Sequence, residues 1–276
     1  MINITEITPE DSIKLQKMIE SATQLIKAAQ YQWIQTPTID SYNSLSPGLG
    51  NHLKTSVVRF MDRGNDSLIL RPDNTAPIAR IMASTPAPKQ PVKLFYNASK
   101  FQRHPKSNDI VETLEFGFEI IADSSANADA EILITLSQLL TTLGFKDHII
   151  DVGHSKSAQA LPHNKREALL NNDFVKYGEV PERGSIALMK DMDTLKGLYN
   201  ALQHKPESDH IYFNSGLVKE LDYYTGIIFE VYIPHCGYPI ASGGRYDGLL
   251  RTYGTDLPAV GAALNMNTIL SVLGTK

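Results

Sequence analysis

The order of the short β-type runs constrains the fold of this chain more than any other feature. Several of the six runs follow one another with no helix between them; they span residues 66–70, 92–96, 117–121, 148–153, 227–233 and 258–264. A parallel, doubly wound sheet needs a helical crossover after each strand, so this order argues against it. The runs predict an α+β fold, with a mostly antiparallel sheet flanked by helices.

Two flanking helices are marked by their caps. Thr8 is a good N-cap, Pro9 suits the first helical position, and Asp11 follows three residues after the cap. Apolar side chains then recur at helical spacing. A second apolar helix starts near 127–131 and ends at Gly144, a natural residue to follow a helix.

Residues 155–209 differ in character from the rest of the chain. Short helical pieces there are interrupted by Pro162, Gly178, Pro181, Gly184 and Pro206. We expect a small helical insert within one domain over residues 1–276, because a chain of this length can bury one large core.

Composition excludes several classes of protein. The net charge of −4 does not suggest a protein that wraps nucleic acid. One cysteine, Cys236, excludes internal disulfides and Cys-rich zinc sites, and the eight histidines form no metal-binding helical pair. We therefore expect no metal and no cofactor.

The N-terminus lacks the basic and apolar regions of a signal peptide, and no apolar run approaches a membrane span. We expect a cytoplasmic protein. The glycines of "GLGNHLKT" (48–55) lack the spacing of a phosphate-binding loop, so this stretch is interpreted as an ordinary loop.

Polar clusters are embedded in β-type segments. They are "LRPDNTAPIAR" (70–80), "ETLEFGFEIIA" (112–122), "ELDYYTGIIFE" (220–230) and "ASGGRYDGLL" (241–250), the last interpreted as a Gly-Gly-Arg-Tyr-Asp turn. In a strand, Glu115 and Glu119 share one face, and Phe116, Phe118 and Ile120 share the other, which would pack on the core. Each acidic cluster alone could be a solvated surface. Several clusters on neighbouring strands favour a pocket for a cationic ligand.

Together these clusters resemble, in order, the catalytic core of histidyl-tRNA synthetase and its relatives, which are class II synthetases. The first is similar to the family's Arg-Pro-Glu-x-Thr segment, and the second, with "KFQRHP" before it, to motif 2. "LVKELDYYTGIIFE" is similar to the histidine-specific Arg-Gly-Leu-Asp-Tyr-Tyr segment, and "PAVGAALNMNTIL" occupies the place of motif 3. The resemblance spans about residues 8–273 and implies a class II synthetase-like core.

The arginines on which synthetase chemistry depends are replaced. Gln102 follows Phe101 where motif 2 has its arginine, although a one-residue shift would align Arg103 instead. The motif 3 Glu-Arg pair becomes Asn267-Thr268, and the histidine-specific Arg-Gly becomes Lys219-Glu220. Losing this set removes much of the electrostatic stabilisation that adenylate formation needs. The chain also ends at Lys276, so no anticodon-binding domain is expected.

One relative of the synthetases fits these departures, the regulatory subunit of ATP phosphoribosyltransferase in histidine biosynthesis. The resemblance implies a non-catalytic subunit that activates a short catalytic subunit and confers feedback inhibition by L-histidine. No phosphoribosyl-pyrophosphate signature occurs here, so the transferase chemistry belongs on the partner chain. The motif 1 region, about residues 10–40 with Pro37, implies a dimer of this chain within a hetero-oligomer, and no tRNA partner is expected.

The resemblance also assigns histidine-binding roles and no catalytic residues. Glu119 and Tyr224 would face the imidazole, and Lys219 would meet the ligand carboxylate. The α-ammonium would be held by Asp73, Thr75 and Glu115, while Tyr223 and Tyr246 would form walls. Glu115 stands where synthetases have glutamine, which would make the pocket more acidic.

Three alternatives stay open from the sequence. The chain could be a divergent histidine–tRNA ligase core, or a stand-alone module that binds histidine or tRNA without a transferase partner. A degenerate pocket that is kept only for fold stability would show a similar pattern. The sequence does not determine stoichiometry, the surface that contacts the partner, whether histidine binds this chain alone, or how activation is transmitted.

Overall fold

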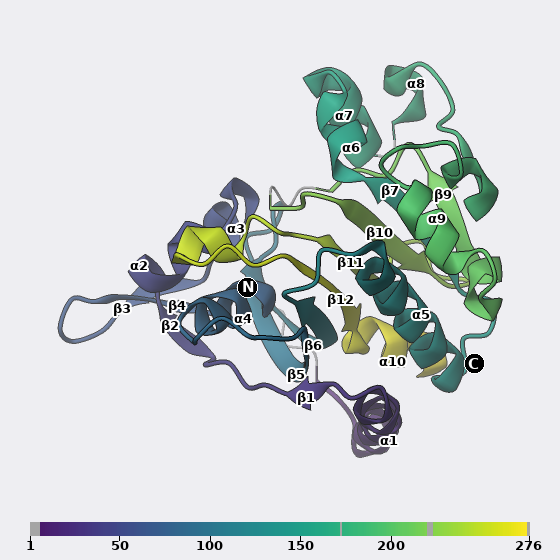
Figure 1. Ribbon diagram of the computed structural model, residues 1–276. Coiled ribbons are helices and arrows are strands. Elements are labelled where there is room, and N and C mark those ends of the chain that lie inside the picture. Colours follow the sequence, from purple (N-terminus) through teal and green to yellow (C-terminus); the bar gives the residue numbers. More distant parts are fainter. Residues whose placement is uncertain (1–5, 172, 220–222, 275–276) are drawn as a thin grey trace.

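A computed structural model describes residues 6–171, 173–219 and 223–274 (Figure 1). Its main sheet has nine strands in the order β1-β5-β6-β12-β11-β10-β7-β9-β8, and a second sheet has the order β2-β4-β3. The strands are β1 (Gln32–Trp33), β2 (Ile39–Ser41), β3 (Arg59–Met61), β4 (Ser67–Leu70), β5 (Val92–Arg103), β6 (Ile110–Ile121), β7 (Ile149–His154), β8 (Arg183–Ser185), β9 (Ile211–Asn214), β10 (Ile227–Tyr232), β11 (Ala241–Arg245) and β12 (Ala259–Asn265). The β1–β5 and β7–β9 pairs are parallel and the other neighbouring pairs are antiparallel, which confirms the predicted α+β sheet.

The helices are α1 (Pro9–Ala28), α2 (Tyr42–Leu45), α3 (Asn51–Ser56), α4 (Thr75–Ala83), α5 (Ala126–Thr142), α6 (Ser155–Ala160), α7 (His163–Leu170), α8 (Phe174–Tyr177), α9 (Lys196–Leu202) and α10 (Met266–Gly274). Helix α1 begins as predicted, with the Thr8 hydroxyl accepting from the backbone N–H of Asp11 at 3.2 Å. Gly144, with φ of +93°, follows the end of α5. Within the described residues, no helix is long and apolar enough to cross a bilayer.

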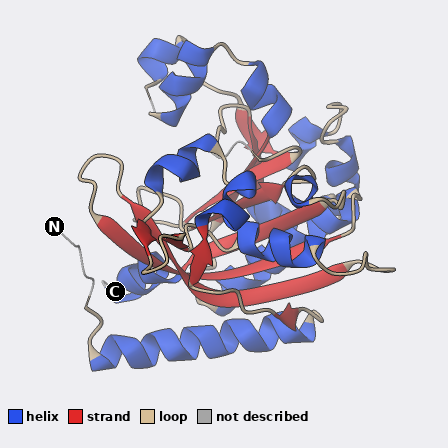
Figure 2. Cartoon of the chain, turned by 90° about the vertical axis from the view of Figure 1, so that its left-hand side faces the viewer, coloured by secondary structure: helices blue, strands red, loops and turns tan. Residues whose placement is uncertain are grey.

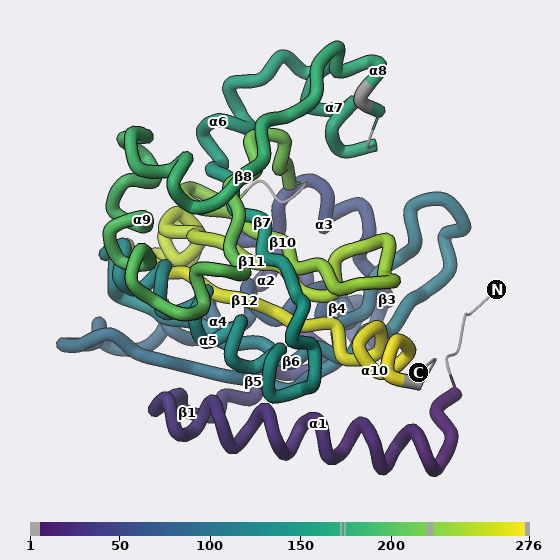
Figure 3. Tube along the Cα trace, turned by 90° about the vertical axis from the view of Figure 1, so that its right-hand side faces the viewer, coloured from purple at the N-terminus to yellow at the C-terminus, as the bar shows by residue number. Residues whose placement is uncertain are grey.

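One face of the main sheet is covered by α1, α5, α9 and α10, and the larger hydrophobic core lies there. Figure 2 shows α1 as one long helix along the outside of the sheet, and Figure 3 shows the same helix beneath β5. Phe116, Phe118 and Ile120 of β6 point into this core, as their alternation predicts. Phe116 and Phe118 are fully buried.

The opposite face of the sheet carries the polar side chains of β6 and a second, smaller core. That core includes Ile78 and Ala79 of α4, Tyr96 of β5, Tyr224 from the segment before β10, and Tyr246, which follows β11. Glu115 and Glu119 of β6 lie on this face and are 8% and 2% exposed. They therefore line a buried site and not a solvated surface.

The segment 155–209 contains the short helices α6 to α9, but it also contains the strand β8, which its Pro and Gly content did not predict. Strand β8 pairs with β9 at the edge of the main sheet, and Leu198 and Leu202 of α9 join the larger core. In Figure 1, α6, α7 and α8 stand beyond the sheet near β7. Part of the segment is thus joined to the main domain.

Candidate ligand pocket

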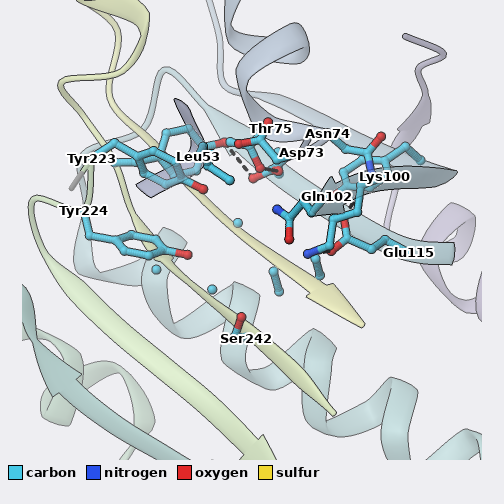
Figure 4. A pocket seen from close by; sticks show the side chains of 18 residues that line it. Leu53, Asp73, Asn74, Thr75, Lys100, Gln102, Glu115, Tyr223, Tyr224 and Ser242 are labelled. Atoms are coloured by element: carbon cyan, nitrogen blue, oxygen red, sulfur yellow. Dashed lines mark hydrogen bonds and ion pairs between the residues drawn. The ribbon is translucent and has the colours of Figure 1, made fainter. Parts of the chain in front are cut away.

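A cavity of about 80 Å³ lies on the polar face of the sheet, above β6, β11 and β12. Seven of the eight predicted site residues line it: Asp73, Thr75, Glu115, Glu119, Tyr223, Tyr224 and Tyr246. Figure 4 shows Tyr223 and Tyr224 on one side, with Lys100, Gln102 and Glu115 on the opposite side. Segments 150 residues apart therefore converge on one pocket. The eighth predicted residue, Lys219, lies in an adjoining cleft.

Glu119 of β6 lines the pocket and is almost fully buried. Its carboxylate accepts hydrogen bonds from the Tyr246 hydroxyl at 2.6 Å and from the Thr75 hydroxyl at 3.1 Å. Gly261 of β12 leaves the space for this side chain, because a Cβ there would meet the Glu119 carboxylate. Burial raises the pKa of Glu119 to about 8, against the opposing effect of both hydrogen bonds. At neutral pH the group is therefore mostly protonated.

This buried carboxyl predicts a stability that falls as pH rises. The folded chain holds a proton on Glu119 up to about pH 8, whereas an unfolded glutamate loses it near pH 4, so this contribution is lost as pH rises through 8. His148, whose pKa burial lowers to about 4, acts in the opposite direction only below about pH 6.5. The free energy of unfolding should therefore fall between about pH 6.5 and 8.5, by up to about 1.4 kcal/mol per pH unit.

Urea denaturation of the ligand-free protein across this pH range measures the effect. Glu119→Gln should flatten the curve, because glutamine keeps the shape of the side chain and does not titrate. An equally steep decline in the variant would assign the pH dependence to another group.

Asp73 carries the least satisfied carboxylate of the pocket. One oxygen, Oδ1, accepts from the backbone N–H of Ala76 at 2.9 Å, near the first turn of α4. Buried Oδ2 has no hydrogen-bond partner among the described residues, and neither has the amide oxygen of Asn74 beside it. Burial raises the pKa of Asp73 to about 6, so the carboxylate is ionised at pH 7.5. These two acceptors are suited to a cationic donor.

Glu115 is already paired within the pocket. Its carboxylate contacts the Lys100 ammonium at 2.8 Å and accepts from the Asn74 amide at 3.0 Å. Burial lowers the pKa of Lys100, but the adjacent Glu115 outweighs this, and the pKa is raised overall. Lys100 therefore remains charged and neutralises Glu115, so the extra acid that distinguishes this pocket adds little net charge.

The tyrosines form a connected wall. The ring of Tyr223 lies 5.0 Å from that of Tyr224 and 6.0 Å from that of Tyr246, centroid to centroid. Gly244 lets the Tyr224 ring approach β11, because a Cβ there would lie 2.8 Å from it. The predicted Gly-Gly-Arg-Tyr-Asp turn (243–247) was placed too early: residues 241–245 are strand β11, and a turn begins only at Asp247. The two glycines are required by close packing rather than by turn geometry.

At two positions where the resemblance places an arginine, the side chain of this protein forms a hydrogen bond with the backbone. The Gln102 amide donates to the Pro72 carbonyl at 2.8 Å from the pocket face of β5. Arg103, the next residue, does not line the pocket and donates to the Asn108 carbonyl at 3.3 Å. On α10, the Asn267 side chain accepts from the backbone N–H of Leu114 at 2.6 Å. The alternation of β5 thus assigns Gln102, and not Arg103, to the pocket.

Lys219 lies in a cleft of about 700 Å³ that shares Leu53, Lys100, Gln102 and Ser242 with the pocket. Its ammonium contacts the Glu230 carboxylate at 2.7 Å, and the Tyr232 hydroxyl donates to the same carboxylate at 2.6 Å. The structure therefore pairs Lys219 with a protein acid. Glu220, its neighbour in the replaced Arg-Gly pair, lies outside the described residues.

The sequence patterns missed several lining residues: Leu53, Asn74, Tyr96, Lys100, Ser242 and Gly261. Two local predictions were also wrong, because residues 51–56 form helix α3 and not a loop, and Thr75 starts helix α4 instead of lying in a β-type run. The strict alternation of Tyr96, Lys100 and Gln102 along β5 was the available signal for that wall.

Comparison with known proteins places the chain in a family. The histidyl-tRNA synthetase family model matches residues 3–174 and 180–269. An ATP phosphoribosyltransferase regulatory subunit from Desulforamulus reducens is 31% identical, and the alignment covers 98% of this chain and 78% of that protein. The chain belongs to this family of regulatory subunits. A second member, from Caldanaerobacter subterraneus subsp. tengcongensis, is 29% identical over 98% of this chain and 81% of its own.

Solved structures support the assignment of the chain to this family. An ATP phosphoribosyltransferase regulatory subunit/histidyl-tRNA synthetase from Bacillus halodurans superposes with a TM-score of 0.86, at 25% identity over 99% of this chain and 82% of that one. Apo histidyl-tRNA synthetase from S. aureus, at 24% identity, shares the fold with a TM-score of 0.71 over 99% of this chain and 70% of that one. The predicted class II synthetase-like fold and regulatory-subunit family are confirmed.

Proposed function

We propose that this regulatory subunit activates a short ATP phosphoribosyltransferase catalytic subunit and makes the complex sensitive to L-histidine through the pocket above β6. The names of its relatives support a catalytic partner. The observation that carries the histidine part is the buried carboxylate oxygen of Asp73, which has no partner in the described part of the chain and shares the pocket with Glu119 and the tyrosine wall. These groups suit an ammonium at one end of a ligand and a hydrogen-bonding ring at the other.

The same pocket is poorly equipped for ligase chemistry. Adenylate formation needs permanently charged forks on the ATP phosphates, and no arginine occurs among the described residues that line the pocket. Its lysine, Lys100, is paired with Glu115. A sensing pocket is therefore favoured over a divergent ligase, and a tRNA partner is not proposed.

We also propose a two-fold dimer of this chain within the complex. The segment assigned to motif 1 by resemblance exposes large apolar side chains on α1, β1 and β2: Ile13, Trp33 and Ile39 are each more than half exposed. Such side chains on neighbouring elements favour burial against a second copy.

Reconstitution with the short transferase tests the whole proposal. Adding this chain should raise transferase activity, L-histidine should inhibit the complex, and light scattering should show a mass that contains at least two copies of each chain. A mass equal to that of the separate monomers, with no gain in activity, would favour the stand-alone binding module.

The expected lack of ligase activity can be tested independently. Purified protein should catalyse histidine-dependent exchange of pyrophosphate into ATP at no more than background, because the electrostatic stabilisation of the transition state is missing. A full-length histidyl-tRNA synthetase is the positive control. Exchange at a comparable rate would identify a divergent ligase instead.

A further inference from the structure

Acidic side chains outnumber basic ones in the lining of the pocket. Three carboxyl groups line it, those of Asp73, Glu115 and the mostly protonated Glu119, whereas Lys100 is the one lysine or arginine among the described lining residues. Figure 4 shows Lys100 beside Glu115, on the side away from the tyrosines. The balance favours a cation and disfavours an additional anion.

Both lysines near the expected position of a ligand carboxylate are already paired. Lys100 contacts Glu115 at 2.8 Å, and Lys219 in the adjoining cleft contacts Glu230 at 2.7 Å. Both pairs are largely shielded from water: the side chains of Lys219 and Glu230 are each 15% exposed. A ligand carboxylate would have to share one of these lysines with a protein carboxylate that already neutralises it, while lying near ionised Asp73.

The pocket suits the ammonium and imidazole ends of a ligand better than its carboxylate. Among the described residues, Asp73 Oδ2 and Asn74 Oδ1 are buried acceptors without partners, so an ammonium there adds hydrogen bonds and breaks none. The Glu119 carboxyl and the tyrosine wall lie in the same cavity and offer donors and acceptors to a neutral imidazole.

We propose that this pocket recognises imidazole-bearing primary amines and gains no affinity from the carboxylate of histidine. The proposal rests on the proposed function and specifies its ligand class. Histamine, which is histidine without its carboxylate, should therefore bind at least about as well as L-histidine. Imidazole-4-propionate, which keeps the carboxylate and lacks the ammonium, should bind at least tenfold more weakly than either.

Isothermal titration of the reconstituted complex at pH 7.5 with these three ligands tests the proposal. The expected result is a histamine dissociation constant no more than threefold that of L-histidine. A larger advantage for L-histidine would overturn this inference and leave histidine sensing intact. If neither compound binds, the proposed histidine site is itself refuted, and this inference fails with it.

A second variant tests the physical cause. Glu230→Gln keeps an acceptor for the Tyr232 hydroxyl but releases Lys219 from its ion pair, so the affinity for L-histidine should rise at least fivefold relative to histamine. Glu179→Gln is the matched control, since it releases Lys165 from a pair that lines neither the pocket nor the cleft. An unchanged ratio in Glu230→Gln would overturn the role assigned to the Lys219–Glu230 pair.

Discussion

Asp129→Ala is expected to lower the free energy of unfolding by about 3–5 kcal/mol, the largest effect among the substitutions considered. Asp129 lies in the first turn of α5 and is 7% exposed. Its carboxylate accepts from the guanidinium of Arg245 on β11 through two nitrogens, each at 2.8 Å. Arg245 is itself 6% exposed. The contact with Asp129 offsets the free-energy cost of removing the guanidinium charge from water.

The cost comes from the partner that remains. After the substitution Arg245 keeps bonds to Asp247 at 3.0 Å and to the carbonyl oxygens of Asp123 and Ser125, but a buried guanidinium loses its closest counter-charge. Water cannot replace that charge without opening the contact between α5 and β11. The pair as a whole adds little net stability, whereas breaking it is costly.

Urea denaturation measures the change, with Asp256→Ala as the matched control. Asp256 accepts from Arg251 at 2.8 Å, but both side chains are about two-thirds exposed, so the control should change stability by no more than about 1 kcal/mol. The double change Asp129→Leu with Arg245→Met should recover part of the loss, because it leaves no buried charge. A loss below 1 kcal/mol in Asp129→Ala would show that water reaches the guanidinium.

Asp73→Asn is expected to weaken the binding of L-histidine by about ten- to a hundredfold. A hydrogen bond between charged groups contributes about 1.5–3 kcal/mol. At pH 7.5 Asp73 is ionised, and its Oδ2 has no partner within residues 6–171, 173–219 and 223–274. Asparagine keeps an oxygen for the backbone N–H of Ala76, but its amide nitrogen would face the ligand ammonium. Binding of L-histidine should therefore weaken while the fold is kept.

Histidine titration of transferase activity in the reconstituted complex is the appropriate measurement. The expected variant complex is assembled and active, with inhibition displaced to higher histidine concentration, because under the proposed function activation needs only subunit contact and inhibition also needs the pocket. Asp40→Asn is a suitable control, because Asp40 pairs with Arg80 at 2.6 Å and does not line the pocket. Unchanged inhibition in Asp73→Asn would place the regulatory site elsewhere, on the partner or at the junction between subunits.

The sequence by itself determined the features that depend on local periodicity and on motif order. The N-cap of α1, the glycine that follows α5, the six β-type runs and the apolar face of β6 follow from local sequence alone. Side chains alternate across a strand, and cap residues act on nearby backbone. The order of the polar clusters identified the family. Local rules failed at residues 241–245, where glycine, a common turn residue, serves close packing between strands.

Only the tertiary structure decided which charges of the site are free. Glu115 and Lys219 were assigned to the ligand from motif position, yet the fold brings Lys100 against Glu115, and Glu230 against Lys219. It also assigned Gln102 to the pocket and left Asp73 Oδ2 without a partner. Such pairings join residues on different strands and loops. Their distances are set by the packing of the sheet, and no local pattern in the chain encodes them.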